Sequence, residues 1–340
     1  MRESGNQGIR NLGNWDGALI PDSPIPDSLI ERLLTGDRRA IARLITIIEN
    51  DGAEAQEALA VLYPHTGQAH IVGVTGAPGT GKSTLVNELA KVYRQRDRTV
   101  GIIAVDPTSP FSGGALLGDR IRMRDLSGDP GIFIRSMATR GSLGGLARAT
   151  ADVVKVLDAA GYQTIFVETV GAGQAEVDIA KAAHTTIVVE APGLGDDIQA
   201  IKAGITEIAD IFVVNKADRE GADSTALALE MTLNLNHPSH ISPQTPGWRP
   251  PICKTIALHG EGIAAVVEAI EEHAAYLRES GNLQRRERER VEGELRSIIT
   301  QEMARSFFKR LDEAQFDSLV DSIMRRELDP YSAVAMLLED

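Results

Sequence analysis

Cysteine is almost absent from this chain of 340 residues, which contains only Cys253. One thiol cannot form a disulfide framework within the chain or a metal site built from cysteine pairs. Because Cys253 lies in an apolar run, we expect it to be a small, buried hydrophobic residue. This cysteine usage is typical of a reducing compartment, and we expect a cytoplasmic protein.

Long apolar runs, a secretory signal and excess positive charge are missing as well. No apolar stretch reaches 18 residues, so the sequence predicts no transmembrane span. The N-terminus lacks a basic region followed by an apolar one, which argues against a secretory signal. The net charge of −13 argues against nucleic acids and anionic membranes as partners. Aromatic residues make up only 4% of the chain, beside 32 glycines, which favours an α/β sheet of small aliphatic residues with many loops.

Composition and periodicity divide the chain into four segments. Residues 1–26 are rich in Gly, Asn, Asp and Pro, which predicts a mostly disordered terminus. Residues 27–66 repeat apolar residues at helical spacing and are expected to form a helical arm. Residues 67–280 carry the alternating pattern of a nucleotide-binding domain. Residues 281–340 combine a mixed-charge helix with an apolar helical stretch, which suits a subunit contact.

Short β-rich runs interleaved with helical runs predict an α/β fold with a mostly parallel central sheet flanked by helices. The runs show no simple polar–apolar alternation, which indicates strands that are buried on both faces. The expected strands are residues 70–75, 99–105, 132–137, 163–167, 185–190, 211–214 and 252–257. The expected helices of this domain begin at Lys82 and cover 146–160, 175–183, 197–203, 224–235 and 263–277.

The most informative motif is a phosphate-binding loop, G-x-x-x-x-G-K-S, between an expected strand and an expected helix. In such a loop, glycines let the backbone approach phosphate closely, and N–H groups at the helix start point at the phosphate. Lys82 would neutralise β- and γ-phosphate oxygens, and the Ser83 hydroxyl would bind Mg²⁺. The nucleotide-binding residues predicted here are Gly76, Ala77, Pro78, Gly79, Thr80, Gly81, Lys82, Ser83 and Thr84.

A second motif, N-K-x-D, follows the strand expected at residues 211–214 and predicts the base. Ligands in open α/β sheets bind beyond the carboxyl ends of the strands. There Asp218 can accept two hydrogen bonds from guanine, whereas adenine offers no such donor pair and would leave the carboxylate unpaired. Lys216 can lay its methylene groups over the base, and Asn215 can tie this loop to the phosphate loop. Together the two motifs favour GTP over ATP.

Three carboxylates near the ends of expected strands are candidate Mg²⁺ ligands, because hard cations prefer oxygen. Asp106 follows one strand, and Asp119 closes the loop after it, where its alternative role is to cap the next helix. Glu168 ends another strand and can hold the water shell of Mg²⁺. The Gly171 N–H can sense the γ-phosphate, so this loop would order with GTP and relax after hydrolysis. Gln174 either orients the attacking water or caps a helix.

Taken together, these residues resemble the MeaB/ArgK branch of the G3E GTPases, whose human relative is the methylmalonic aciduria type A protein. The runs D-P-T-S-P at 106–110 and G-D-D-I-Q-A-I-K-A-G at 195–204 are specific to this branch. The guanine loop reads K-T-I-A at 254–257 where Ser-Ala is common, so only Ala257 is carried over as a nucleotide contact. The resemblance covers about residues 30–280, through segments 36–46, 76–83, 106–110, 117–120, 168–174, 192–204 and 215–218.

The resemblance implies a P-loop NTPase fold of the SIMIBI/G3E type that uses GTP, GDP and Mg²⁺. It also implies a metallochaperone that gates adenosylcobalamin loading and protects an acyl-CoA mutase, such as methylmalonyl-CoA mutase. Proteins of this branch are homodimers, so residues 281–340 are expected to be a dimerisation extension, and a cobalamin adenosyltransferase is a further candidate partner. A third switch corresponds here to Asp196, Gln199 and Lys202, which share one helix face. Lys202 is the candidate to reach the active site or the partner once that helix moves, and the alternative is an ordinary amphipathic helix start with acidic capping.

Three other functions are weighed against this one. A nickel-insertion GTPase of the same superfamily needs clustered metal ligands, whereas this chain has one cysteine and seven scattered histidines. A kinase acting on a transport protein, which ArgK-type names once implied, is disfavoured because N-K-A-D argues against ATP. A pure binding module is disfavoured by the complete set of Lys82, Ser83, Asp106 and Glu168.

Overall fold

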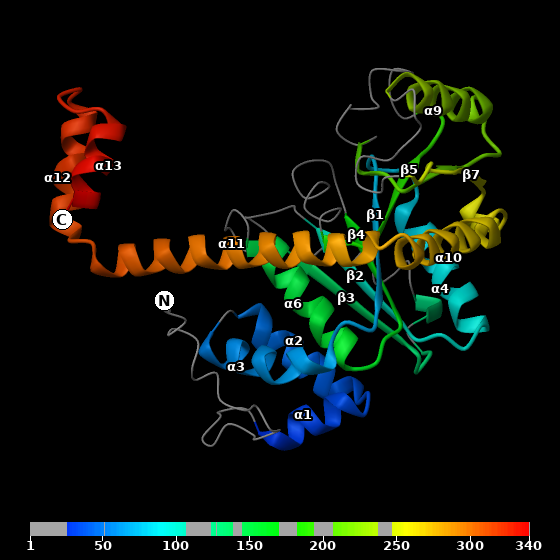
Figure 1. Ribbon diagram of the computed structural model, residues 1–340, viewed down its shortest axis with the longest axis horizontal. Helices are drawn as coiled ribbons and strands as arrows, with labels where there is room; N and C mark the ends of the chain where they lie inside the picture. The colour runs from blue at the N-terminus through cyan, green and yellow to red at the C-terminus, as the bar shows by residue number, and fades with distance from the viewer. Residues whose placement is uncertain are drawn as a thin grey trace, which may run out of the picture. The chain divides into compact units, whose positions relative to one another are not determined.

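The computed structural model describes residues 26–50, 52–106, 124–126, 128–138, 145–169, 182–193, 207–236 and 247–339. The chain forms two compact units, Met1–Leu283 and Gln284–Asp340. The first unit holds a central sheet with its helices, and the second holds helices alone (Figure 1). The four segments expected from the sequence stay a prediction, and the terminus expected to be disordered lies outside the described residues.

A parallel sheet of seven strands forms the centre of the first unit (Figure 1). The strands follow the order β3-β2-β4-β1-β5-β6-β7, and every neighbouring pair runs parallel. Strands β1, β4, β5 and β6 are buried almost throughout, since helices cover the sheet. The predicted α/β class is therefore confirmed. The strands are β1 His70–Thr75, β2 Val100–Asp106, β3 Ile132–Ala138, β4 Thr164–Thr169, β5 Thr185–Glu190, β6 Ile211–Asn215 and β7 Ile252–Thr255.

Successive residues of each strand face opposite sides of the sheet, and the two sides build separate apolar cores. Val72 faces the core that α4 and α10 share, whereas its neighbour Ile71 faces the core shared with α6. Helix α9 packs against β6 and β7 at one edge. The four helices are α4 Lys82–Gln95, α6 Gly145–Ala159, α9 Ala222–Asn236 and α10 Ile263–Glu279.

The N-terminal arm consists of three short helices, of which the second and third pack on α6 and the first packs on the second. The chain can turn between the first two because Gly36 adopts φ +79°, a left-handed conformation that favours glycine. Asp37 then caps the second helix by accepting hydrogen bonds from the backbone N–H groups of Arg39 and Ala40. The helices are α1 Asp27–Leu34, α2 Arg38–Glu49 and α3 Ala53–Leu62, followed by the 3₁₀ turn η1 Tyr63–His65.

Asp158, on α6, fixes the chain where the arm leads into β1. Its carboxylate accepts hydrogen bonds from the backbone N–H groups of Gly67, Gln68 and Ala69, at 2.6, 3.1 and 2.9 Å. A buried carboxylate satisfied by three donors holds the linker firmly. The arm and the strand that delivers the phosphate loop are therefore anchored to the same helix.

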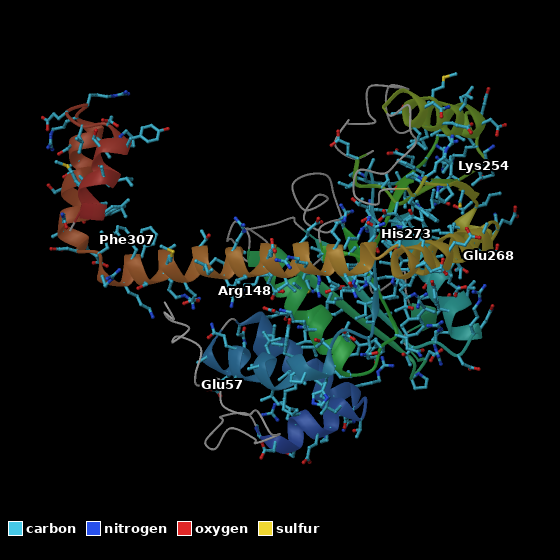
Figure 2. All side chains as sticks on the ribbon, in the orientation of Figure 1. Glu57, Arg148, Lys254, Glu268, His273 and Phe307 are labelled. Atoms are coloured by element: carbon cyan, nitrogen blue, oxygen red, sulfur yellow. The ribbon has the colours of Figure 1, made fainter. Side chains whose placement is uncertain are left out.

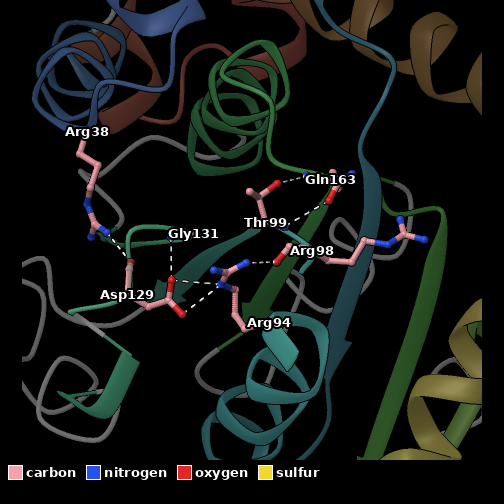
Figure 3. Close-up of polar contacts among 7 residues, drawn as sticks. All are labelled: Arg38, Arg94, Arg98, Thr99, Asp129, Gly131 and Gln163. Carbon is pink, nitrogen blue, oxygen red and sulfur yellow. Dashed lines mark hydrogen bonds and ion pairs between the residues drawn. The ribbon is translucent and has the colours of Figure 1, made fainter. Parts of the chain in front are cut away.

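Asp129 joins three elements ahead of β3 (Figure 3). Its carboxylate accepts hydrogen bonds from Arg94 Nε at 3.0 Å and from the Gly131 N–H at 2.7 Å. Its backbone carbonyl accepts one from Arg38 Nη1 at 2.7 Å. The hydrogen bond from Arg94 is the main cause that lowers the pKa of Asp129. The end of α4, the start of α2 and the entry to β3 therefore meet at one ionised group.

A buried polar chain ties α10 to the amino ends of the sheet strands. His273, labelled in Figure 2, forms a hydrogen bond through Nδ1 with Thr185 Oγ1 at 2.9 Å, and its Nε2 lies 3.3 Å from Asp210 Oδ1. Thr185 Oγ1 also forms a hydrogen bond with His70 Nε2 at 2.8 Å. These side chains serve packing at the edge opposite the phosphate loop, because they lie at the starts of β1, β5 and β6.

Three of the sequence-based expectations about the strands need correction. Strand β4 runs to Thr169, two residues further than expected, and β7 stops at Thr255 instead of reaching Ala257. Ala257 begins a 3₁₀ turn, η3 (Ala257–His259), because its N–H bonds to Asn215 Oδ1 and Gly260 closes the turn at φ +74°. Cys253 is half-buried rather than buried, since β7 is an edge strand.

The second unit consists of most of α11 together with α12 and α13. Arg288 pairs with Glu292 at 2.9 Å and Arg290 with Glu287 at 2.6 Å, which confirms the expected ion pairs along the charged helix. The apolar stretch after it forms two helices, separated where Arg326 adopts φ +62°. Within the described ranges, no helix is both long and apolar enough to cross a membrane. The helices are α11 Asn282–Arg310, α12 Glu313–Met324 and α13 Pro330–Glu339.

Candidate nucleotide-binding site

The phosphate loop lies between the carboxyl end of β1 and the first turn of α4, where the sequence predicts it. A side chain at Gly76 would meet the Val189 carbonyl oxygen of β5 at 2.1 Å, and one at Gly81 would meet Asn215 Nδ2 at 2.4 Å. Both glycines have positive φ, +136° and +95°. The loop can therefore keep this path only with glycine at both positions.

Lys82 and Ser83 begin α4 with both side chains turned into the loop. Lys82 is 5% exposed, and its Nζ donates to the carbonyl oxygens of Gly76 at 2.7 Å and Ala77 at 3.0 Å. Ser83 Oγ donates to Glu168 Oε1 at 2.5 Å. A cation and a hydroxyl–carboxylate pair thus stand at the start of a helix, where the helix dipole favours an anion.

Asn215, 2% exposed at the end of β6, joins the phosphate loop to the next loops. Its Nδ2 donates to the Thr80 carbonyl oxygen at 2.8 Å. Its Oδ1 accepts from Thr255 Oγ1 and from the Ala257 N–H, both at 3.1 Å. Lys216 adopts φ +58° and reaches back to donate from Nζ to the Gly79 carbonyl oxygen at 2.6 Å. The two sequence motifs are therefore in direct contact.

Asp218 and Leu258 are exposed beside these fixed groups. Asp218 is an exposed carboxylate without an ion pair among the residues that the structure describes. Leu258 is 79% exposed, although it follows Ala257, whose N–H is bonded to Asn215. The sequence reasoning missed Leu258, and its only signal was an apolar residue directly after Ala257. An acceptor and an apolar surface are what a flat, donor-rich base would contact.

The acidic candidates are placed in part. Glu168 lies in β4 between β1 and β2, pairs in register with Val74 and Ala104, and is 1% exposed. The backbone of Asp106 ends the neighbouring strand β2, so it lies at the same edge as Glu168, but its side chain is outside the described set. The remaining predicted site residues all fall outside the described ranges; they are Asp119, Gly171, Gln174, Asp196, Gln199 and Lys202.

A phosphate loop on a parallel sheet, tied through an asparagine to an N-K-x-D loop, defines a P-loop nucleotide-binding protein. Residues 41–312 match the model of the family described as Methylmalonyl Co-A mutase-associated GTPase MeaB. The chain belongs to this family and is a GTPase, which confirms the resemblance to the MeaB/ArgK branch and the choice of a guanine nucleotide.

Several relatives cover nearly the same length of chain. A protein from Pyrococcus horikoshii whose name assigns it to the GTPases is 55% identical over 313 residues, or 92% of this chain and 97% of that one. The GTPase ArgK of Escherichia coli is 32% identical over 327 residues, or 94% and 98%. The mitochondrial methylmalonic aciduria type A homolog of Caenorhabditis briggsae is 30% identical over 317 residues, or 87% and 75%.

A solved structure shares the fold over the same span. The crystal structure titled LAO/AO transport system kinase superposes with a TM-score of 0.70 at 26% identity. The match covers 93% of this chain and 98% of that one. The fold therefore agrees with the family assignment along nearly the whole chain.

Proposed function

We propose that this GTPase binds GTP with Mg²⁺ and uses hydrolysis to gate the loading of adenosylcobalamin into an acyl-CoA mutase. Methylmalonyl-CoA mutase is the favoured partner, because the family description names a GTPase associated with that enzyme. The relative named for methylmalonic aciduria supports the same partner. Within this chain, the observation that carries the proposal is the Asn215 side chain, which couples the phosphate loop to the base loop.

In the proposed complex, guanine lies beyond the ends of β6 and β7. Asp218 accepts hydrogen bonds from N1–H and the 2-amino group, and Ala257 borders the base through the turn that it begins. The Lys216 stem covers one face of the base, since its Nζ is already drawn towards Gly79. Leu258 supplies an apolar surface beside the proposed position of guanine.

Phosphate and Mg²⁺ binding are assigned to the loop and to the acidic strand ends. Lys82 exchanges its two carbonyl partners for phosphate oxygens, and the N–H groups from Gly79 to Thr84 surround the phosphates. The Ser83 hydroxyl and the Glu168 carboxylate are already within 2.5 Å of each other, and a hard cation fits such oxygen donors. Asp106 and Asp119 complete the proposed ligand set. Mg²⁺ would neutralise charge on the transferred phosphoryl group.

The remaining predicted residues receive switch roles. We assign Gly171 and Gln174 to the loop that senses the γ-phosphate, and Asp196, Gln199 and Lys202 to the segment that senses the mutase. The support is their place after β4 and β5, whose carboxyl ends flank β1 and the phosphate loop. Segments that γ-phosphate orders and hydrolysis releases are a common switch in GTPases.

A homodimer built through the second unit is part of the proposal. Its helices expose large apolar side chains that a monomer leaves in water. On α11 they recur every four residues and so lie along one side of the helix. They are Val291, Leu295, Ile299 and Met303.

Complex formation with a cognate mutase tests the proposal. We expect size-exclusion chromatography of the two proteins to show a complex whose amount differs several-fold between a non-hydrolysable GTP analogue and GDP. A kinase acting on a transport protein, as one related structure is titled, would instead label a protein substrate with phosphate from radioactive nucleotide. If no complex forms in any nucleotide state, the mutase is not the partner.

A further inference from the structure

Helix α2 carries two exposed arginines, Arg39 and Arg43. The surrounding residues all have structural tasks. Asp37 caps the helix, and Arg38 binds the Asp129 carbonyl oxygen at 2.7 Å. The apolar residues of the helix are buried against α6 and the rest of the arm, and they are Ala40, Ile41, Leu44, Ile45 and Ile48.

Within the part of the chain that the structure describes, neither guanidinium forms a hydrogen bond or an ion pair. Other arginines of the same unit are engaged: Arg32 with Asp37 at 2.7 Å, and Arg94 with Asp129 at 3.0 Å. Arg135 pairs with Glu49 at the other end of α2. Arg98 and Arg219 are exposed as well, so Arg39 and Arg43 stand apart because the two cations lie four residues apart on one helix.

Two exposed arginines near the N-terminus of a helix destabilise that helix. Arg39 and Arg43 are four residues apart, so their like charges lie one above the other and repel. Arg39 also lies in the first turn, where the helix dipole is positive and where α2 has no acidic residue. An exposed arrangement that weakens its own helix, and that forms no hydrogen bond or ion pair with the described residues, is typical of a surface kept for a partner.

The chemistry of the surface specifies the partner. Guanidinium groups prefer carboxylates, which they bind through paired hydrogen bonds. A chain of net charge −13 repels nucleic acids and anionic membranes as a whole, so a local carboxylate pair on a protein fits better than a polyanion. We propose that Arg39 and Arg43 form a docking surface for an acidic patch on a partner protein, with two carboxylates about 6 Å apart to match one helical turn. Naming the mutase as that partner rests on the proposed function.

Arg43→Glu and Arg98→Glu form a matched pair of variants for the test. Each changes the net charge by two, and Arg98 is likewise exposed. It follows the end of α4 and precedes β2 (Figure 3). In Arg43→Glu, the new carboxylate stands four residues from Arg39, so repulsion becomes attraction and the melting temperature should not fall. The binding and stability effects of this variant therefore have opposite signs, which a merely structural residue would not produce.

Binding is measured to the mutase and to a fluorescein-labelled peptide rich in glutamate, each at 20 and 200 mM salt. For Arg43→Glu we expect about tenfold weaker binding of both at low salt, with a smaller loss at high salt, and for Arg98→Glu a change below about twofold. Equal binding by wild type and Arg43→Glu overturns the docking surface, even if the mutase binds. If the mutase fails to bind wild type but the peptide still discriminates, the docking surface stands and the proposed function fails.

Discussion

At the scale of single residues, we propose that Asp218 decides the choice of base. Asp218→Asn replaces one carboxylate oxygen with a donor, so guanine loses its paired hydrogen bonds. We expect GTP binding to weaken about 100-fold and xanthosine triphosphate binding to improve, because xanthine carries an acceptor at C2. Competition binding of GTP, ATP and the xanthine nucleotide measures both effects. Equal affinity of the wild type for ATP and GTP would show that Asp218 does not select guanine.

We propose a second decisive role for Lys82, at the phosphates. Lys82→Ala removes the cation that faces the transferred phosphoryl group, and we expect GTP turnover to fall about 100- to 1,000-fold. Nucleotide affinity should fall as well. Lys91→Ala, further along the same helix, is the matched control and should keep its activity. Turnover of Lys82→Ala at the wild-type rate would exclude the phosphate-loop mechanism.

The contacts of motif residues could be predicted from the sequence, whereas the exposure of single side chains could not. Gly76, Gly81 and Asn215 follow from chemistry that the motifs themselves carry. The structure places Gly81 against Asn215 and Gly76 against the backbone of β5. The exposure of Leu258 and of Cys253 depends on where the chain leaves the edge of the sheet. A local apolar run cannot tell an edge strand from a central one, so Cys253 was expected to be buried.

At the scale of elements, the junction at Asp129 should contribute stability that depends on pH. Its pKa is lowered in the folded protein, mainly by Arg94, so its contribution is present above the ordinary aspartate pKa. The contribution is lost as the pH falls through the lowered folded pKa. We expect Asp129→Asn to reduce the free energy of unfolding by about 1 kcal/mol at pH 7 and by less at pH 3.

Urea unfolding at the two pH values measures this difference. Asp125→Asn is the control, because that carboxylate is exposed and lies 3.9 Å from Lys91. A loss of stability for Asp129→Asn that is the same at both pH values would mean that ionisation of Asp129 does not hold the junction.

Periodicity located most elements but misjudged their ends. The helical spacing from residue 27 onward was correct, yet the breaks between α1, α2 and α3 depend on a left-handed Gly36 and the Asp37 cap. The end of β7 depends on Asn215, a residue some forty positions earlier in the chain. Such long-range hydrogen bonds are invisible to a local pattern.

At the scale of the whole molecule, alternating patterns predicted a parallel sheet but not the order of its strands. β4 lies between β2 and β1, although it follows both in the chain. Pairing of that kind is set by packing of the helices on each face, which the sequence pattern does not encode residue by residue. The same order brings Glu168 beside Ser83, 85 positions apart.

Lys202 lies outside the described residues, and we predict that it couples GTP turnover to contact with the mutase. Lys202→Ala should leave GTP affinity and basal turnover nearly unchanged, and should reduce the mutase-stimulated rate at least several-fold. Comparing both rates for wild type and variant isolates the coupling step. Equal stimulation of the two proteins would remove Lys202 from the mechanism and leave the partnership intact.

The proposed partnership with a mutase is tested most directly by the GTPase rate with and without a cognate adenosylcobalamin-dependent mutase. We expect slow hydrolysis by the protein alone, because no arginine finger is evident among the residues that the structure describes. Adding the mutase should raise the rate at least tenfold by fixing the switch segments. A rate that no such mutase changes would contradict the account.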